Sequence, residues 1–251
     1  MGAANNPGTT MAGLLMTRPP KGNARFLALL PDALRAQFNF VESPLIKISP
    51  IGEVPLLKDV DHVIFTSQNG VEVASDLTPD RRPAICVGQR TTERACELGW
   101  DAKMAGKDSG EFLQVLLRTP SKGRLLHLRG AESRGAIAKT LQNAGITCGE
   151  QVLYAQELQD FSATANGLIQ SDMPLIVTLF SPRTARHFAQ IMPQRQHLTL
   201  IVLSDAVAEP LRCLQCEALH VSKTPNAPAM AALLDHVAGS EPWVERLRPK
   251  D

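Results

Sequence analysis

The chain contains the same strand, turn and helix pattern twice, and this repetition limits the folds that it can adopt. Residues 63–74 read VIFTSQNGVEVA and residues 178–189 read TLFSPRTARHFA, each an apolar run ending in Phe, followed by Ser, a turn and a helix start. A second pair, ICVGQRTTERACELGWDA at 85–102 and IVLSDAVAEPLRCLQCEA at 201–218, repeats the arrangement. Repeated units of this kind indicate two domains built in the same way.

A weaker third pair completes each set: RLLHLRGAESRGAIAKTLQNAGI at 124–146 resembles GLLMTRPPKGNARFLALLPDAL at 13–34. The second of these units opens the chain, whereas its companions come last, so the pattern favours a domain split by an insertion. The expected parts are a split domain of residues 12–43 and 158–240, an inserted domain of residues 48–154, and connecting segments 42–48 and 149–157 that pair as an antiparallel hinge. Two consecutive domains dividing near residue 120, where TPSKG forms a turn-rich break, are the alternative.

Short apolar runs alternate with amphipathic helical stretches over most of the chain, which is typical of doubly wound, mostly parallel sheets. We therefore predict an α/β protein of two similar flavodoxin-like domains. Right-handed crossovers bring the strand-to-helix turns to one edge of each sheet, where ligands bind. The ends, 1–11 and 241–251, are expected to be loose tails. The predicted strands are Leu14–Thr17, Val41–Ile48, Val63–Thr66, Ala84–Val87, Ala102–Met104, Leu125–Leu128, Thr147–Tyr154, Leu175–Phe180, Thr199–Leu203 and Ala218–Val221.

Composition indicates a soluble protein in a reducing compartment. The 251 residues are 44% apolar and 20% charged, as in globular proteins. No apolar run approaches the roughly 18 residues of a membrane helix, and the start, MGAANNPGTT, lacks the features of a secretory signal. Five scattered cysteines argue against a disulfide framework. With a net charge of +1 and 4% aromatic residues, the chain shows no sign of nucleic-acid binding. We expect a cytoplasmic monomer with neither nucleic-acid nor membrane partners.

The turns after the strands carry helix caps. Ser67 or Asn69 can cap the helix that follows the first repeated strand, and Ser181 precedes Pro182, which suits the first helical position. Open N–H groups at helix starts bind anions, although every such turn is also an ordinary cap. Asp205 is an unfavourable neighbour for an anion, so at that turn the prediction relies on Ser204 and the backbone.

Basic residues are concentrated in these turns. The turn windows together hold nine Lys or Arg residues against three acids, whereas the whole chain has 26 against 25. An anionic ligand is the natural inference. The windows are 17–25, 66–72, 88–94, 127–135 and 181–187. The candidate substrate-binding residues are Arg18, Ser67, Gln68, Asn69, Gly88, Arg90, Thr91, Arg129, Gly130, Arg134, Ser181, Arg183, Thr184 and Ser204.

The sequence lacks the motifs of several kinds of binding site and catalytic site. The sequence has no G-x-G-x-x-G after the first strand, no phosphate-binding P-loop, no G-x-S-x-G elbow and no His/Asp/Glu set with metal spacing. Cys213 and Cys216 form a C-x-x-C without a second pair. We therefore expect no cofactor and no metal. Tyr154, the only tyrosine, could pass a proton to a departing group or be an amphipathic aromatic residue on a half-buried strand.

Taken together, the motifs resemble the uroporphyrinogen-III synthase family over about residues 12 to 237. The segments that carry the resemblance are TRPPKGNARF (17–26), VIFTSQNGVEVA (63–74), CVGQRTTERACELGW (86–100), LLHLRGAESRGAIAKTL (125–141), VLYAQ (152–156), LFSPRTARHFA (179–189) and LSDAVAEPL (203–211). The resemblance implies a cofactor-free lyase of heme and tetrapyrrole biosynthesis. Such an enzyme dehydrates hydroxymethylbilane, inverts its terminal pyrrole ring and closes the macrocycle in a cleft between two domains. Every ring of this substrate carries an acetate and a propionate.

The resemblance also implies roles for single residues. Ser67, Thr91, Tyr154 and Ser181 match positions that line the family's cleft, and Tyr154 is the best candidate to assist departure of the hydroxyl group. Charge alone suggests further contacts with the substrate carboxylates. These are Arg18, Arg129, Arg134 and Arg183.

Two other classes of function compete with this one. A non-enzymatic, hinge-bending receptor for an anionic ligand would also use two α/β domains with basic turns, but such receptors are usually exported. A transferase with a nucleotide or methyl donor would need a glycine-rich loop after a first strand, and the sequence has none there. Turnover would separate an enzyme from a receptor.

Overall fold

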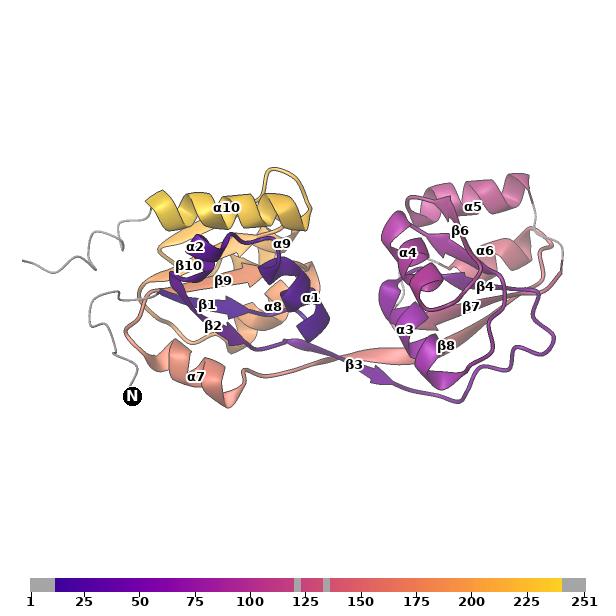
Figure 1. Cartoon of the computed structure of the whole chain (residues 1–251), viewed down its shortest axis with the longest axis horizontal. Coiled ribbons are helices and arrows are strands. Elements are labelled where there is room, and N and C mark those ends of the chain that lie inside the picture. Colours follow the sequence, from indigo (N-terminus) through magenta and orange to yellow (C-terminus); the bar gives the residue numbers. More distant parts are fainter. Residues whose placement is uncertain (1–11, 120–122, 133–135, 241–251) are drawn as a thin grey trace, which may run out of the picture. The chain divides into compact units, whose positions relative to one another are not determined.

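The computed structural model describes residues 12–119, 123–132 and 136–240, and the predicted loose tails at 1–11 and 241–251 lie outside these ranges. The chain divides into two compact units. Residues 1–47 and 158–251 form the first, here called the split unit, and residues 48–157 form the second, the inserted unit. The chain passes between the units in two strands, β3 (Ile46–Pro50) and β8 (Cys148–Leu158) (Figure 1).

The split unit is a five-stranded parallel sheet of order β11-β10-β9-β1-β2. Its strands are almost continuously apolar, as expected for strands covered on both faces. They are β1 (Ala12–Met16), β2 (Phe38–Glu42), β9 (Leu175–Leu179), β10 (Leu198–Val202) and β11 (Ala218–Val221). Its helices are α1 (Pro20–Leu27), α2 (Asp32–Arg35), α7 (Ala163–Gln170), α8 (Pro182–Ile191), α9 (Asp205–Ala208) with the 3₁₀ turn η1 (Glu209–Leu211), and α10 (Ala227–Ser240).

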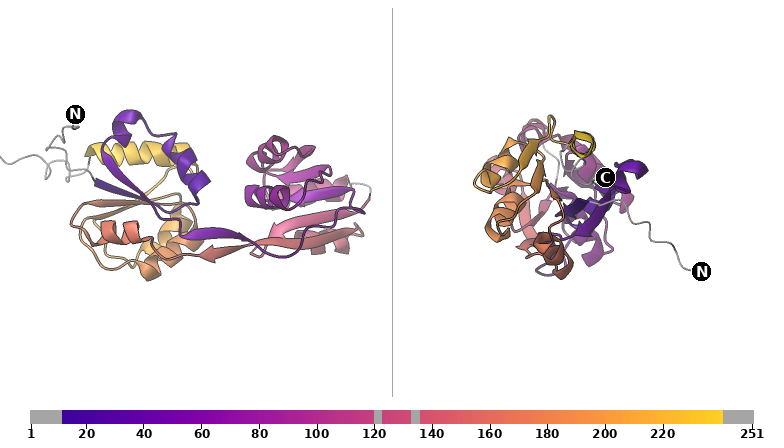
Figure 2. Two further views of the ribbon diagram at one scale, coloured as in Figure 1. Left: turned by 60° about the horizontal axis from the view of Figure 1, so that its bottom comes forward. Right: turned by 90° about the vertical axis from the view of Figure 1, so that its left-hand side faces the viewer.

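Helices cover both faces of this sheet (Figure 2). On one face, α7, α8, α9 and η1 pack on the strands around Phe188. On the other face, α1, α2 and α10 pack around Phe26 and Leu234. Two apolar cores, one on each face, therefore fix the sheet, so that only its edges and the ends of its strands face solvent.

The inserted unit repeats this build with one more strand, in the order β3-β8-β7-β4-β5-β6. Its pairs other than β3 with β8 are parallel. Helices α3 and α4 cover the face that holds Phe65 and Trp100, and α5 and α6 cover the face that holds Ile64 and Phe112. Its other elements are β4 (His62–Phe65), α3 (Gln68–Leu77), β5 (Ala84–Val87), α4 (Gln89–Glu97), β6 (Ala102–Gly106), α5 (Ser109–Arg118), β7 (Leu125–Gly130) and α6 (Ile137–Asn143).

The strand orders confirm the internal repeat. Reading each sheet outwards from β9 in the split unit and from β4 in the inserted unit gives the same neighbours: β10 and β11 on one side match β5 and β6, and β1 and β2 on the other match β7 and β8. The three sequence pairs thus occupy equivalent places, and the predicted fold of two similar doubly wound parallel sheets is confirmed. Equivalent strands end in equivalent turns, so each unit carries its own set of strand-end turns.

The connecting segments differ in detail from the prediction. The expected single strand Val41–Ile48 is wrong: β2 ends at Glu42 and β3 begins at Ile46, because Pro44 between them has no N–H for a strand ladder. The expected antiparallel pairing is confirmed. The amide of Gln159 donates to the Leu45 carbonyl and the amide of Ile51 donates to the Leu153 carbonyl, so the partner numbers run in opposite directions.

Candidate active site

The phenol of Tyr154 lies against the turn that follows β4. Its oxygen is 2.8 Å from Oγ of Ser67, and the residue is only 4% exposed. Ser67 is the N-cap of α3: its backbone is extended, and its Oγ accepts a hydrogen bond of 3.1 Å from the amide of Gly70. Burial raises the pKa of Tyr154, and the hydrogen bond with Ser67 opposes this rise. The phenol is therefore protonated at neutral pH and held by a hydroxyl that can stabilise its anion.

A β-bulge aims Tyr154 at this turn. Arg129 of β7 pairs with Val152 of β8, but the next residue, Gly130, pairs with Tyr154, so Leu153 is the extra residue. Leu153 and Tyr154 both pack in the core beneath α3 and α4, although neighbours on a regular strand point to opposite faces. Bulges re-aim side chains in this way next to active sites.

Gly130 is required by the tyrosine ring. A Cβ atom on Gly130 would lie 2.7 to 2.9 Å from the ring carbons and hydroxyl oxygen of Tyr154, well inside van der Waals contact. The amide of Ala131 also donates to the Tyr154 carbonyl at 2.8 Å. Gly130, predicted as a substrate contact, therefore also makes the room in which Tyr154 sits.

A buried histidine lies within β7, the strand that pairs with β4. His127 is 1% exposed; its Nε2 is 3.4 Å from Oγ1 of Thr66, and its Nδ1 is buried with no hydrogen-bond partner among the described residues. Burial, with the positive charge of Arg129 as a second cause, lowers the pKa of His127 to about 4. The imidazole is thus neutral at physiological pH.

The start of α4 takes part in the candidate site mainly through its backbone. Gly88 has φ of +78° and precedes the helix, and a left-handed backbone of this kind favours glycine. The amide group of the Gln68 side chain donates to the carbonyl of Arg90 at 3.1 Å, which ties the starts of α3 and α4 together. Arg90 itself is exposed. Thr91 is buried, with 6% exposure. Asn69 is half-buried.

In the split unit, Ser181 repeats the cap of Ser67. Its Oγ accepts a hydrogen bond of 3.1 Å from the amide of Thr184 and lies 2.7 Å from the hydroxyl of that residue, and Pro182 follows at the first helical position. Thr184 is 7% exposed. Ser204 precedes α9 without a side-chain cap bond, and Asp205 is exposed in the first turn of that short helix.

The predicted arginines divide by their surroundings. The guanidinium of Arg18 lies 4.3 Å above the ring of Phe180, a cation–π contact. Arg183 is half-buried at the start of α8. Arg134 lies outside the described residues. Arg94, counted among the basic turn residues, pairs with acids at 2.9 Å.

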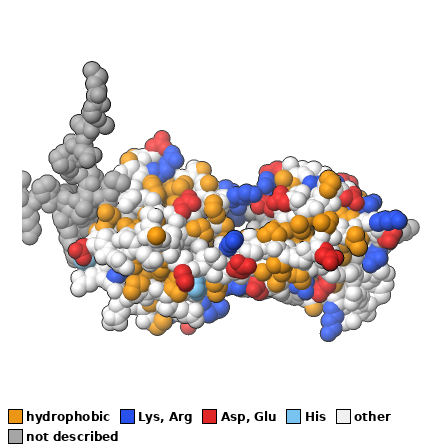
Figure 3. Space-filling model, turned by 90° about the horizontal axis from the view of Figure 1, so that it is seen from below, with side chains coloured by type: hydrophobic (Ala, Val, Ile, Leu, Met, Phe, Trp, Pro, Cys, Tyr) orange, Lys and Arg blue, Asp and Glu red, His pale blue; other side chains and the backbone are white. Residues whose placement is uncertain are grey.

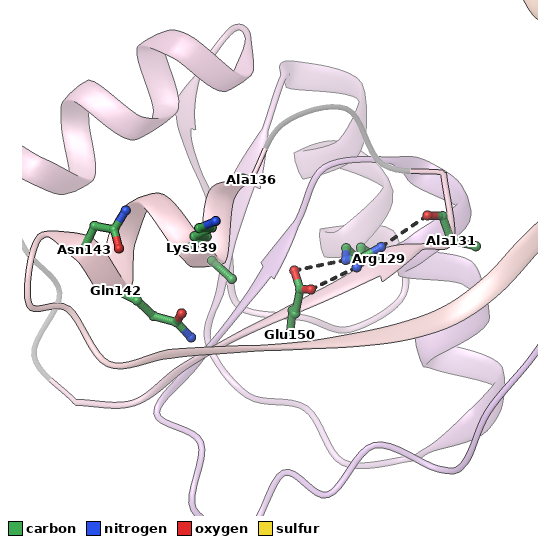
Figure 4. A pocket seen from close by; sticks show the side chains of 8 residues that line it. Arg129, Ala131, Ala136, Lys139, Gln142, Asn143 and Glu150 are labelled. Carbon is green, nitrogen blue, oxygen red and sulfur yellow. Dashed lines mark hydrogen bonds and ion pairs between the residues drawn. The ribbon is translucent and has the colours of Figure 1, made fainter.

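All three guanidinium nitrogens of Arg129 are bonded to protein oxygens. Its Nε and Nη2 atoms donate to the two carboxylate oxygens of Glu150 at 3.1 and 2.9 Å, and its Nη1 donates to the carbonyls of Gly130 and Ala131 at 2.9 and 3.3 Å. The same pair borders a pocket of about 580 Å³ in the inserted unit (Figure 4). The pocket is lined by Arg129, Ala131, Ala136, Ala138, Lys139, Gln142, Asn143 and Glu150.

Sequence reasoning missed Glu150 and Thr66. Glu150 lies outside the basic turns, because it is on a strand and reaches Arg129 only through the β7–β8 register. Basic and acidic side chains also lie next to one another at several places on the face in Figure 3.

Among the described residues, no group of three or more His, Cys, Asp or Glu side chains could hold a metal ion, and none of the described helices is long and apolar enough to span a bilayer.

These features define a class of protein: two doubly wound α/β units with the same strand order, whose strand-end turns are capped by serines, with a buried phenol at one of them. The model of the family described as uroporphyrinogen-III synthase HemD matches residues 29–232. The chain belongs to the uroporphyrinogen-III synthase family, whose members are cofactor-independent, cyclising lyases of heme biosynthesis that act on a tetrapyrrole.

Solved structures agree on the fold. The chain is similar to uroporphyrinogen-III synthetase from Helicobacter pylori 26695, with 15% identity, a TM-score of 0.62, and coverage of 90% of this chain and 100% of that one. It is also similar to a mutant uroporphyrinogen III synthase from the extremely thermophilic bacterium Thermus thermophilus, with 13% identity, a TM-score of 0.51, and coverage of 92% and 100%. A search of curated protein sequences gives no match.

Proposed function

We propose that Tyr154 supplies the proton on which the family reaction depends in this chain. The reaction begins when the hydroxyl group of hydroxymethylbilane leaves as water, and a leaving hydroxyl needs a proton from a general acid. The observation that carries the proposal is the 2.8 Å contact between Tyr154 and Ser67. The protonated phenol lies at a strand-end turn, and such turns are where α/β proteins bind ligands.

The proton transfer leaves a negative charge on Tyr154, and Ser67 is placed to stabilise that charge. Transfer of the phenol proton to the substrate hydroxyl breaks the carbon–oxygen bond, releases water and leaves an azafulvene cation and a phenolate. Ser67 can donate a hydrogen bond to the phenolate, while its oxygen still accepts one from the amide of Gly70 at the N-terminus of α3. The positive end of a helix favours negative charge beside it. Ser67 thus stabilises the anion that the first step creates.

The later steps return the proton. The substituted carbon of the terminal ring attacks the cationic carbon and forms a spiro intermediate, which opens and recloses with the ring inverted. Closure releases one proton from the pyrrole carbon where the new bond forms, and the Tyr154 phenolate is a base that can accept it. One residue can therefore give a proton and take one back, and the cycle consumes neither a metal nor a cofactor.

The strand-end turns of each unit bind the carboxylates of the substrate in this proposal. The linear substrate is a polycarboxylate, and helix N-termini with backbone donors bind anions. In the split unit we assign this role to the start of α8, through Ser181, Arg183 and Thr184, and to Arg18. Ser204 joins them through its hydroxyl. In the inserted unit we assign it to the starts of α3 and α4, through Gln68, Asn69, Gly88, Arg90 and Thr91.

Location and assembly follow from the same proposal. We infer a cytoplasmic enzyme that acts as a monomer and binds neither nucleic acid nor membranes. The five cysteines are all free, which supports a reducing compartment. A non-enzymatic receptor for an anionic ligand, the alternative from the sequence, is not favoured, because the family consists of enzymes.

The test is an isomer analysis. Hydroxymethylbilane is generated in situ, the protein is added without metal or cofactor, and the uroporphyrin isomers are resolved after oxidation. Spontaneous closure yields the type I isomer, so we expect type III to appear in proportion to added protein. Heat-denatured protein is the control. If type I is the only product at every protein concentration, the proposed function fails.

A further inference from the structure

We infer that Arg129 and Glu150 are a positioning pair for Tyr154: together they fix the bulge between β7 and β8 that turns the phenol toward Ser67. This inference rests on the function proposed above. It assigns Arg129 a role different from the substrate contact that its charge suggests, and it gives Glu150 a role in the reaction without contact to the substrate.

The first support is the hydrogen bonding of Arg129. All three of its guanidinium nitrogens donate to protein oxygens, two to Glu150 and one to the carbonyls of Gly130 and Ala131. Its side chain is 17% exposed. A two-pronged pair with a carboxylate is the most strongly oriented contact that arginine makes. Such an arginine holds the backbone to which it is bonded.

The second support is the position of the carbonyls. Gly130 is the residue that pairs with Tyr154 across the bulge, and the amide of Ala131 donates to the Tyr154 carbonyl. Arg129 therefore binds the carbonyl of the Gly130–Ala131 peptide group, whose N–H is bonded to the Tyr154 carbonyl, and also the carbonyl of Ala131. Glu150, on the same strand as Tyr154, closes the link between β7 and β8.

The third support is local charge. Glu150 lies beside Arg129 and neutralises it, and the guanidinium holds the pKa of the Glu150 carboxyl below its ordinary value. The pair is thus ionised at neutral pH and has no net charge to offer a ligand carboxylate. Figure 4 shows the two side chains bonded to each other at the edge of the pocket. The pair suits a structural link better than an anion site.

The experiment compares Glu150→Gln, Arg129→Gln and the double variant in the isomer assay. Glu150→Gln is almost isosteric at a half-exposed position and should fold normally. We expect each single variant to lower kcat about tenfold with KM unchanged, since small displacements of a reacting group are costly. The double variant should be no slower than either single one. In a Tyr154→Phe background, Glu150→Gln should cause no further loss.

Tyr154 also gives a readout that does not need turnover. It is the only tyrosine in the chain, so protein labelled at tyrosine shows a single ring signal by NMR. We expect Glu150→Gln to move that signal toward the value of an exposed tyrosine. Glu97→Gln is the matched control, because Glu97 also pairs with an arginine at 2.9 Å in the inserted unit; it should change neither kcat nor the signal.

The outcomes are distinguishable. A raised KM with unchanged kcat for Arg129→Gln, together with normal Glu150→Gln, would make Arg129 a substrate contact and overturn the inference. An unmoved tyrosine signal in Glu150→Gln would overturn it as well. If the wild-type protein yields only type I product, the proposed function fails, whereas the NMR comparison still decides whether the pair positions Tyr154.

Discussion

The hydroxyl oxygens of Tyr154 and Ser67 lie 2.8 Å apart, although 87 residues separate them in the sequence. Each belongs to a different kind of local structure: Ser67 caps α3 after a regular parallel strand, whereas Tyr154 sits beside a bulge. Their contact joins a helix N-terminus to an ionisable side chain. Substitutions at both residues and at their neighbours should therefore change the reaction in different ways.

Replacing Tyr154 by Phe removes the hydroxyl and keeps the ring that packs in the core. We expect kcat to fall about 100-fold, within the usual range for loss of a general acid, and KM to change little. Steady-state assays of type III formation measure both. A wild-type rate in this variant would remove the proton role of Tyr154.

Replacing Ser67 by Ala tests the support of the phenolate. The variant loses both the bond to Tyr154 and the cap of α3, so we expect a roughly tenfold lower kcat and a loss of about 1 kcal/mol in the free energy of unfolding. Ser162→Ala is the matched control, because Ser162 caps α7 by accepting from the Ala165 amide. It should lose similar stability with unchanged kcat. Equal kinetics in the two variants would argue against Ser67.

Gly130→Ala introduces a methyl group where the tyrosine ring lies. With atoms of the tyrosine side chain 2.7 to 2.9 Å away, the ring must move, so we expect kcat to fall more than tenfold and the protein to lose about 1–3 kcal/mol of stability through overpacking. Gly167→Ala is the control: Gly167 lies in α7 and a Cβ there meets nothing within 4 Å. That variant should be as active as the wild type and slightly more stable.

His127 predicts a pH dependence of stability. Its pKa of about 4 in the folded protein lies below the ordinary 6.5, so between these values the unfolded chain binds the extra proton. Stability should therefore be full above pH 6.5 and decline as pH falls toward 4, by up to about 3 kcal/mol from this residue. Urea unfolding at several pH values measures the slope. The slope should be flatter in His127→Gln than in the wild-type protein; an equal slope in the two proteins would contradict the assignment.

The architecture and the caps could be read from the sequence because they depend on local patterns. The paired segments 63–74 and 178–189 specify equivalent strands, turns and helix starts, and Ser67 and Ser181 cap their helices as side chains of that type do after a strand. Continuous apolar runs also indicate which strands are covered on both faces. These properties can be predicted without knowing which strands are neighbours in the sheet.

Local sequence patterns could not predict the orientation of the Tyr154 side chain or the partner of Arg129. A single extra residue, Leu153, changes the face on which Tyr154 lies, and no sequence signal marks the bulge. The pair of Arg129 with Glu150 depends on the register between β7 and β8. Thr91 is a similar case, since only the packing of α4 on the sheet shows that this residue is buried.

One titration tests whether this chain directs hydroxymethylbilane to the type III isomer. The measured quantity is the fraction of type III product as purified, chelator-treated protein is increased against a constant supply of substrate. We expect this fraction to rise toward one, and we expect Tyr154→Phe to need far more protein to reach the same fraction. A product that stays type I at all concentrations of wild-type protein would contradict the assignment of this reaction to the chain.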